Sequence, residues 1–145
     1  MKKNVKNRRA LPLWMWLGLA AFAILLVAAL VFLRPASQAP ILAAEISVSE
    51  AAEKRSAGAF ILDVREPSEW EAVHIPDATL IPLGELPQRL NEVPRDQEVV
   101  VVCRSGNRSK QGRDILINAG FDRVTSMAGG MNDWQAQGFP TTSGQ

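Results

Sequence analysis

A single cysteine, Cys103, follows the pattern of a buried strand and opens a short polar loop. Four valines, Val99–Val102, precede it, and the segment Arg104–Ser109 behind it contains one glycine, two arginines and two serines. A strand that passes through a tight loop into the start of a helix directs backbone N–H groups at a bound anion. Those donors, the helix dipole and nearby arginines favour the thiolate of a cysteine placed there. The sequence therefore predicts a nucleophilic cysteine site.

Positive charge gathers around this cysteine, although the C-terminal part of the chain is acidic. The segment 99–113 has no acidic residue and four basic ones, Arg104, Arg108, Lys110 and Arg113. Residues 45–145 as a whole carry ten basic and fifteen acidic residues. We expect the local cluster to attract a small anionic substrate that the rest of the domain would repel. A domain this acidic is a poor candidate for nucleic-acid binding.

The counts of cysteine and histidine limit the alternatives. One cysteine cannot form an intramolecular disulfide or a multi-cysteine metal site, and the chain has one histidine, so we expect neither a metal nor a cofactor. The competing interpretation of Cys103 is a buried structural cysteine, because free cysteine is often fully buried. The polar and basic residues directly behind Cys103 favour the reactive role.

The first 44 residues predict a single-pass membrane anchor. Residues 1–9 are basic and residues 10–33 are uncharged; as a helix this run would extend about 36 Å, enough to cross a hydrocarbon core of roughly 30 Å. We expect the basic end to stay in the cytoplasm and the domain behind the linker 34–44 to lie outside it. The alternatives are a buried soluble helix and a cleaved signal peptide, whose apolar core is usually shorter, about 7–15 residues.

Strand and helix patterns alternate over the remaining part of the chain, residues 45–141. Helices are expected from the capping box of Ser47 and Glu50 to about Ser56, from Pro67, over 83–90, from near Arg108 to Gly120, and over 131–137. Strands are expected over 60–64, 79–81, 99–102 and 124–127. The alternation predicts an α/β domain with a parallel sheet flanked by helices on both faces. In such folds the reactive crevice lies beyond the carboxyl ends of the strands, where Asp63 and Cys103 stand.

Five motifs in this part of the chain resemble those of single-domain rhodaneses, in the same order and at similar spacings. They are Asp63–Glu66, His74–Pro76, Cys103–Ser109, Ala119–Phe121, and Gly129–Met131 with Trp134. The resemblance covers about residues 45–140 and implies a rhodanese-like fold with sulfurtransferase activity. In that family the cysteine takes a sulfane sulfur from a donor such as thiosulfate, holds it as a persulfide, and passes it to an acceptor such as cyanide or a thiol.

The resemblance also implies roles for the residues of the loop. Cys103 would be the nucleophile, and Arg104 and Arg108 would bind the anionic donor. The persulfide would be cradled by the amides of Arg104, Ser105, Gly106, Asn107, Arg108 and Ser109.

Roles outside the loop are open to more than one interpretation. Asp63 would be an orienting hydrogen-bond acceptor near the loop, or structural. Arg65 would support the site, or form an exposed ion pair with Glu66 or Glu69. We expect His74 to be structural.

Three positions depart from common patterns. Val73 and Asp77 stand where the family often has glycine, which leaves the conformation of the turn at the histidine motif open. Gly112 stands inside a predicted helix, where it costs roughly 1 kcal/mol relative to alanine.

Two other functions compete with sulfur transfer. Phosphatases and arsenate reductases of related fold place five residues between cysteine and arginine, whereas four separate Cys103 from Arg108. The shorter loop makes a tighter cradle, which suits a sulfur atom better than a tetrahedral phosphate. A non-enzymatic module that binds or relays persulfides for a membrane partner would need the same cysteine and loop, so the sequence separates it poorly from an enzyme and identifies no protein partner.

Overall fold

The computed structural model describes residues 42–144 of the 145-residue chain. The predicted basic N-terminus 1–9, the predicted transmembrane helix 10–33 and residues 34–41 of the predicted linker lie outside the described residues. Within residues 42–144, no helix combines the length and the apolar character that crossing a membrane requires.

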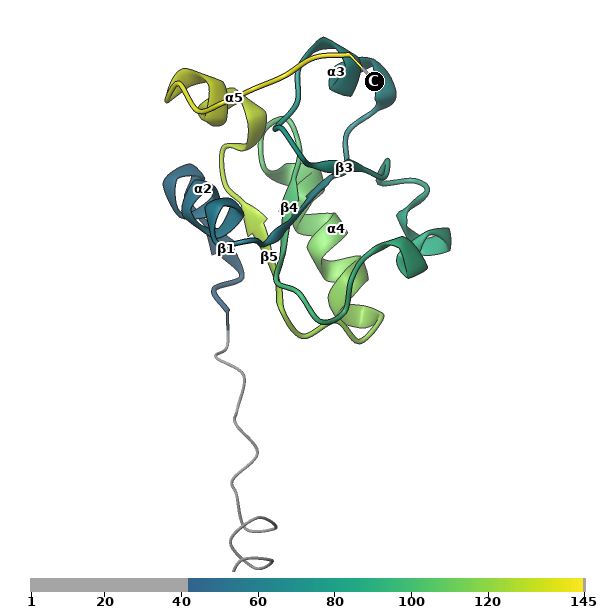
Figure 1. Ribbon diagram of the computed structural model, residues 1–145. Helices are drawn as coiled ribbons and strands as arrows, with labels where there is room; N and C mark the ends of the chain where they lie inside the picture. The colour runs from purple at the N-terminus through teal and green to yellow at the C-terminus, as the bar shows by residue number, and fades with distance from the viewer. Residues whose placement is uncertain (1–41, 145) are drawn as a thin grey trace, which may run out of the picture. The chain divides into compact units, whose positions relative to one another are not determined.

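A five-stranded parallel sheet forms the centre of the domain, with the strand order β1-β5-β4-β2-β3 (Figure 1). The strands are β1 (Glu45–Ile46), β2 (Phe60–Asp63), β3 (Thr79–Leu80), β4 (Val99–Val102) and β5 (Val124–Met127). Strand β4 is central, since it pairs with β2 on one side and β5 on the other. All four of its valines are buried, which confirms the predicted strand covered on both faces.

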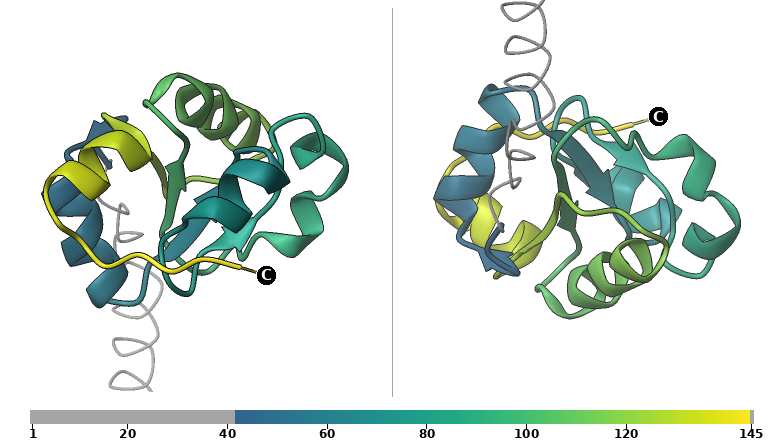
Figure 2. Two further views of the ribbon diagram at one scale, coloured as in Figure 1. Left: turned by 90° about the horizontal axis from the view of Figure 1, so that it is seen from above. Right: turned by 90° about the horizontal axis from the view of Figure 1, so that it is seen from below.

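Helices cover both faces of this sheet (Figure 2). They are α2 (Val48–Ser56), α3 (Pro67–Ala72), α4 (Asn107–Asn118) and α5 (Gly130–Ala136). The core on the side of α2 and α5 contains Ile61, Val100 and Trp134. The core on the side of α4 contains Val101 and Leu116. The predicted α/β domain with a parallel sheet between helices is confirmed.

The predicted signals for the ends of two helices are also confirmed. At the start of α2, Ser47 Oγ accepts the Glu50 N–H at 3.2 Å and Glu50 Oε2 accepts the Ser47 N–H at 2.8 Å, so each residue satisfies a free N–H of the other. Helix α4 ends before Gly120, whose φ of 83° turns the chain away from the helix.

The predicted helix over 83–90 is wrong. The chain instead forms two short 3₁₀ segments, η1 (Leu86–Gln88) and η2 (Leu90–Glu92). An α-helix beginning at Leu83 would need an N–H at position 87 to reach the Leu83 carbonyl, and Pro87 has none. Leu86 is nevertheless fully buried in the core beside α4, so the leucine spacing serves packing without an α-helix.

The N-terminal edge of the sheet was not predicted. Strand β1 is two residues long, too short to show a period, and pairs in parallel with β5. The two residues before it are also bound to β5, since Ala43 O accepts the Thr125 hydroxyl at 2.7 Å and Ala44 O accepts the Ser126 N–H at 3.1 Å.

Asp77 adopts a conformation that glycine takes most readily. Its φ of 63° lies in the left-handed region, which aspartate tolerates better than most residues. Its carboxylate accepts a hydrogen bond from Arg55 Nη2 at 2.9 Å, which holds the turn beside the histidine motif without glycine.

Candidate active site

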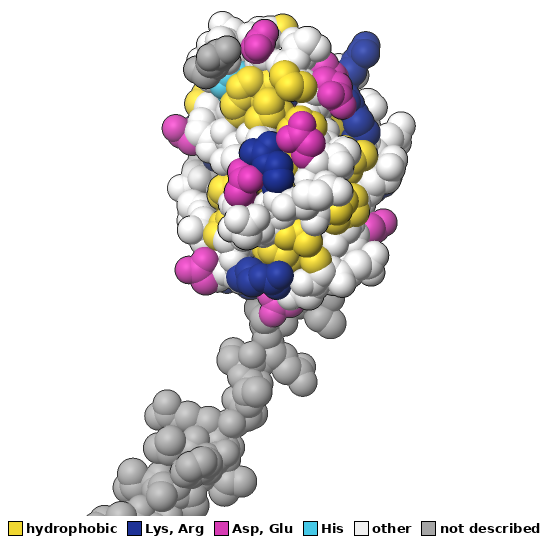
Figure 3. Space-filling view, turned by 90° about the vertical axis from the view of Figure 1, so that its right-hand side faces the viewer, with side chains coloured by type: hydrophobic (Ala, Val, Ile, Leu, Met, Phe, Trp, Pro, Cys, Tyr) yellow, Lys and Arg dark blue, Asp and Glu magenta, His cyan; other side chains and the backbone are white. Residues whose placement is uncertain are grey.

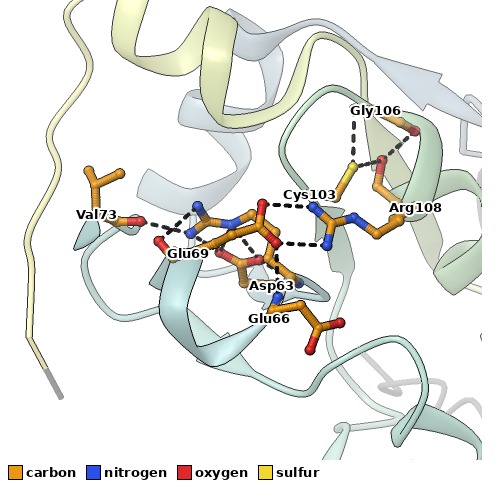
Figure 4. Close-up of polar contacts among 9 residues, drawn as sticks. Asp63, Glu66, Glu69, Val73, Cys103, Gly106 and Arg108 are labelled. Carbon is orange, nitrogen blue, oxygen red and sulfur yellow. Dashed lines mark hydrogen bonds and ion pairs between the residues drawn. The ribbon is translucent and has the colours of Figure 1, made fainter. Parts of the chain in front are cut away.

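Cys103 lies where β4 ends and the loop to α4 begins. Its side chain is 1 % exposed, and its Sγ accepts the Gly106 N–H at 3.1 Å (Figure 4). Ser109 Oγ lies 3.7 Å from Sγ and donates to the Gly106 carbonyl at 2.8 Å. The structure therefore places Cys103, Gly106 and Ser109 in one hydrogen-bonded group at the N-terminus of α4. Of the predicted cradle amides, the one in hydrogen-bond contact with the sulfur is that of Gly106.

The start of α5 also supports the cysteine loop, through backbone hydrogen bonds. The Met131 N–H donates to the Cys103 carbonyl at 2.8 Å, and the Asn132 N–H donates to the Arg104 carbonyl at 3.1 Å. Gly130 permits this contact, because a methyl group added there would overlap the Cys103 carbonyl oxygen. The predicted Gly129–Met131 motif thus positions the backbone of the cysteine loop.

Arg108 forms a two-pronged ion pair with Glu69 of α3. Arg108 Nη1 and Nη2 each donate to a different Glu69 oxygen at 2.8 Å, and Glu69 Oε2 also accepts the Glu66 N–H at 3.1 Å. The hydrogen bonds from Arg108 lower the pKa of Glu69 to about 2, against an opposing effect of burial. The same hydrogen bonds raise the pKa of Arg108, and the nearby Cys103 sulfur adds a smaller electrostatic contribution. Arg108 therefore lies within electrostatic range of the sulfur, with Glu69 on its other side.

The local excess of positive charge is smaller than the four charges expected, because three of the four basic residues form ion pairs. Besides Arg108, Lys110 pairs with Glu45 at 3.1 Å and Arg113 pairs with Asp114 at 2.6 Å. Within residues 42–144, Arg104 is the one basic residue of the four that has no ion pair. On the face shown in Figure 3, basic and acidic side chains likewise lie next to one another. The expected attraction for an anion would therefore depend chiefly on Arg104 and on the loop.

Asp63 and Arg65 form a buried ion pair next to the site. Arg65 Nη2 donates to Asp63 Oδ2 at 2.6 Å and to the Val73 carbonyl at 2.8 Å, and Arg65 Nη1 donates to the Glu69 carbonyl at 3.3 Å. The alternative of an exposed ion pair for Arg65 is wrong, because its side chain is 3 % exposed. Asp63 accepts hydrogen bonds from Arg65 rather than from the cysteine loop, so the pair positions α3.

His74 has the contacts of a structural residue, as expected. Its Nδ1 lies 2.9 Å from the Trp70 carbonyl oxygen. Its ring stacks on the Trp70 ring, with 3.7 Å between the centroids.

A small cavity of about 210 Å³ opens beside the loop, lined by Arg65, Glu69, Val73, Arg104, Met131, Asn132 and Gln135. Two larger hollows, of about 440 and 650 Å³, are lined by other parts of the domain and include no residue of the cysteine loop. The chemistry therefore points to the small cavity, where Arg104 and Glu69 put opposite charges on the walls. Within residues 42–144, no three His, Cys, Asp or Glu side chains are grouped so as to hold a metal ion.

Glu69 is the residue of this site that sequence reasoning did not identify. It was considered only as a surface partner for Arg65, because it lies 39 positions from Arg108 in the chain. One signal could have indicated it: α3 starts directly after β2, so its side chains face the same carboxyl edge of the sheet as the cysteine loop.

The chain is similar to known proteins in sequence and in fold. The family model for the rhodanese-like domain matches residues 47–137. A sulfurtransferase of Allochromatium vinosum is 40% identical over 81 residues, which cover 56% of this chain and 76% of the relative. A thiosulfate sulfurtransferase of Pseudomonas syringae pv. syringae is 34% identical over 90 residues, which cover 62% of this chain and 85% of the relative. The crystal structure of a rhodanese-related protein from Thermoplasma volcanium has a TM-score of 0.64 and 30% identity, covering 69% of this chain and 98% of that one. The chain belongs to the rhodanese-like family, and its sulfurtransferase relatives support sulfur transfer at the level of that family.

Proposed function

We propose that this protein transfers a sulfane sulfur from a donor such as thiosulfate to a thiophilic acceptor through a persulfide on Cys103. The observation that carries the proposal is the position of Sγ at the end of β4. There it accepts the Gly106 N–H at 3.1 Å, at the N-terminus of α4 and within electrostatic range of Arg108. A thiolate held by such donors is the form that attacks sulfur.

In the first half-reaction, the Cys103 thiolate attacks the outer sulfur of thiosulfate. A new bond forms between Sγ and that sulfur, the S–S bond of thiosulfate breaks, and its electron pair leaves with sulfite. The products are the Cys103 persulfide anion and sulfite, so charge is conserved and no proton moves. Arg104, which lines the cavity beside the loop, would hold the oxyanion end of the donor.

In the second half-reaction, an acceptor takes the outer sulfur from the persulfide. Cyanide carbon attacks that sulfur, the S–S bond to Sγ breaks, and thiocyanate leaves while the Cys103 thiolate is restored. A thiolate acceptor would leave as a persulfide by the same exchange. Because the nucleophile is already an anion in each half, the cycle needs no histidine as a base.

Mass spectrometry of the purified full-length chain after treatment with thiosulfate tests the proposal. We expect one added sulfur atom on Cys103, its removal by cyanide with release of thiocyanate, and no addition in Cys103→Ser. Hydrolysis of an aryl phosphate, without any sulfur added by thiosulfate, would instead assign the chain to the phosphatase alternative. Persulfide formation without turnover by cyanide or small thiols would favour the relay module.

We further propose that residues 10–33 anchor the protein in a membrane, with the domain outside the cytoplasm. The support is the uncharged run between the basic residues 1–9 and Arg34. In bacterial cells that produce the full-length chain, the protein should stay in the membrane fraction during alkaline extraction. In spheroplasts of these cells, externally added protease should digest the domain. Recovery in the soluble fraction without cleavage would contradict the anchor, and a shortened soluble chain would indicate a signal peptide.

A further inference from the structure

The ion pair between Glu69 and Arg108 places a negative charge beside a site proposed to take anions. Both side chains are partly buried, with 26 % of Glu69 and 29 % of Arg108 exposed. The two parallel hydrogen bonds occupy both terminal nitrogens of the guanidinium (Figure 4), so a donor that binds Arg108 through these nitrogens must compete with Glu69 for them. None of the proposed sulfur-transfer steps uses this carboxylate.

The charges around the cavity make Glu69 more important than its single charge suggests. Two basic side chains line the cavity, Arg65 and Arg104. Arg65 is neutralised by Asp63, whereas Arg104 has no ion-pair partner within residues 42–144. Glu69 is ionised at neutral pH, as glutamate ordinarily is, and the hydrogen bonds from Arg108 lower its pKa further, to about 2. An entering anion therefore meets the unpaired positive charge of Arg104 and the carboxylate of Glu69, which lines the cavity and is paired with Arg108 on its other side.

We infer that Glu69 is a specificity-determining residue that disfavours doubly charged sulfur donors relative to singly charged ones. The inference deepens the proposed function and rests on it. A donor in the cavity experiences repulsion from Glu69 in proportion to its own charge. Thiosulfate carries two negative charges, whereas an organic thiosulfonate presents the same outer sulfur with one. The site is thereby tuned toward sulfur carried on a small organic group.

Glu69→Gln separates this charge effect from a purely structural one. A glutamine side chain has the same shape, and its carbonyl oxygen can still accept a hydrogen bond from Arg108. Helix α3 keeps the hydrogen bond from Arg65 to the Glu69 carbonyl, because that bond uses the backbone. The matched control is Glu71→Gln, an exposed position on the same helix, which changes the net charge equally without altering the pair with Arg108.

The experiment measures kcat and KM of the full-length protein with thiosulfate and with benzenethiosulfonate, using cyanide as acceptor. In Glu69→Gln we expect the KM for thiosulfate to fall on the order of tenfold and that for benzenethiosulfonate about threefold, since the repulsion halves with the donor's charge. Saturating kcat should stay within about twofold, and Glu71→Gln should change neither KM. Glu69→Ala, which removes the carboxylate altogether, should rank the two donors in the same way.

Three results would overturn the inference. The first is a KM for thiosulfate that rises in both Glu69 variants. The second is a KM for thiosulfate that stays unchanged in them. The third is a change in KM by the same factor for thiosulfate and for benzenethiosulfonate. A rise or an equal change would mean that Glu69 acts only by holding Arg108 in place. Failure of the proposed function is recognised separately, because the unmodified protein would then form no persulfide on Cys103 with either donor.

Discussion

Asp63 and Arg65 place opposite charges inside the domain, where water cannot screen them. Their side chains are 1 % and 3 % exposed, and Arg65 also donates to the Val73 carbonyl. Removing one member of such a pair leaves the other charge buried without compensation, which costs more than the pair itself contributes.

We therefore expect Asp63→Asn to lower the free energy of unfolding by about 3 kcal/mol or more. Urea denaturation followed by circular dichroism measures this loss. The double variant Asp63→Leu with Arg65→Met should lose less than the single variant, because it leaves no charge buried alone. A single variant as stable as the unmodified protein would mean that water reaches Arg65.

Glu69 gives the stability a defined dependence on acid pH. Its pKa is lowered from 4.5 to about 2 in the folded protein, first by the hydrogen bonds from Arg108, so folding favours the ionised carboxylate. The resulting stabilisation is complete above the unfolded pKa and disappears as the pH falls through about 2. The difference in unfolding free energy between the unmodified protein and Glu69→Gln should therefore be constant above about pH 5.5 and shrink between pH 4.5 and 2.

Urea titrations at a series of pH values measure this difference. Glu71→Gln serves as the control for the change in net charge and should show no comparable window. A difference between the unmodified protein and Glu69→Gln that is equally large at pH 2 and at neutral pH would contradict the role of the ionised carboxylate.

At the scale of elements, Gly112 sets how closely α4 approaches the sheet. A methyl group at this position would lie 3.1 Å from Val101 Cγ1 and 3.2 Å from Val64 Cγ1, closer than carbon atoms normally pack. Both valines are fully buried and have few alternative rotamers. The glycine that looked unfavourable for a helix therefore permits the packing that fixes the start of α4 behind Cys103.

We expect Gly112→Ala to destabilise the protein by about 1 kcal/mol, because overpacking outweighs the gain in helix propensity. Equilibrium urea unfolding with an unchanged m-value checks this result. Gln111→Ala, at an exposed position of the same helix, should change the stability little. A Gly112→Ala variant more stable than the unmodified protein would show that the two valines can move aside.

Local patterns were sufficient to predict most elements but not the charges around the site. The capping box of Ser47 and Glu50 and the four valines of β4 act through neighbours in sequence, so their structures could be predicted. The pairing of Arg108 with Glu69 depends on two helices that meet only after folding, and no local pattern contains it. The hydrogen bonds from the α5 amides to the Cys103 and Arg104 carbonyls were missed for the same reason.

At the scale of the whole domain, the site is assembled at one edge of the sheet from three chain segments. Cys103 and Arg108 come from the loop and the start of α4, Glu69 comes from α3, and the amides that hold the loop come from α5. Because parallel strands present their carboxyl ends at one edge, segments distant in sequence meet there. The orientation of α3 is therefore as important to the site as the loop itself.

The last residues of the chain hold α3 from outside. The His74 N–H donates to the Thr142 carbonyl at 2.8 Å, the Thr142 N–H donates back at 2.9 Å, and the Gly144 N–H donates to the Glu71 carbonyl at 2.9 Å. This C-terminal segment, residues 142–144, lies next to the end of the helix that carries Glu69. Removing it deletes three backbone hydrogen bonds but leaves the Trp134 bond to the Pro140 carbonyl intact.

We expect truncation after Thr141 to cost about 1.5–4.5 kcal/mol of unfolding free energy, since each of the three hydrogen bonds contributes about 0.5–1.5 kcal/mol. Hydrogen exchange should accelerate at the His74 amide and along α3, while the amides of β4 stay protected. If α3 loosens, Glu69 is held less firmly beside the cavity, and the preference between thiosulfate and benzenethiosulfonate should move in the direction of Glu69→Gln. A truncated protein with faster exchange in α3 but an unchanged donor preference would show that Arg108 alone keeps Glu69 in place.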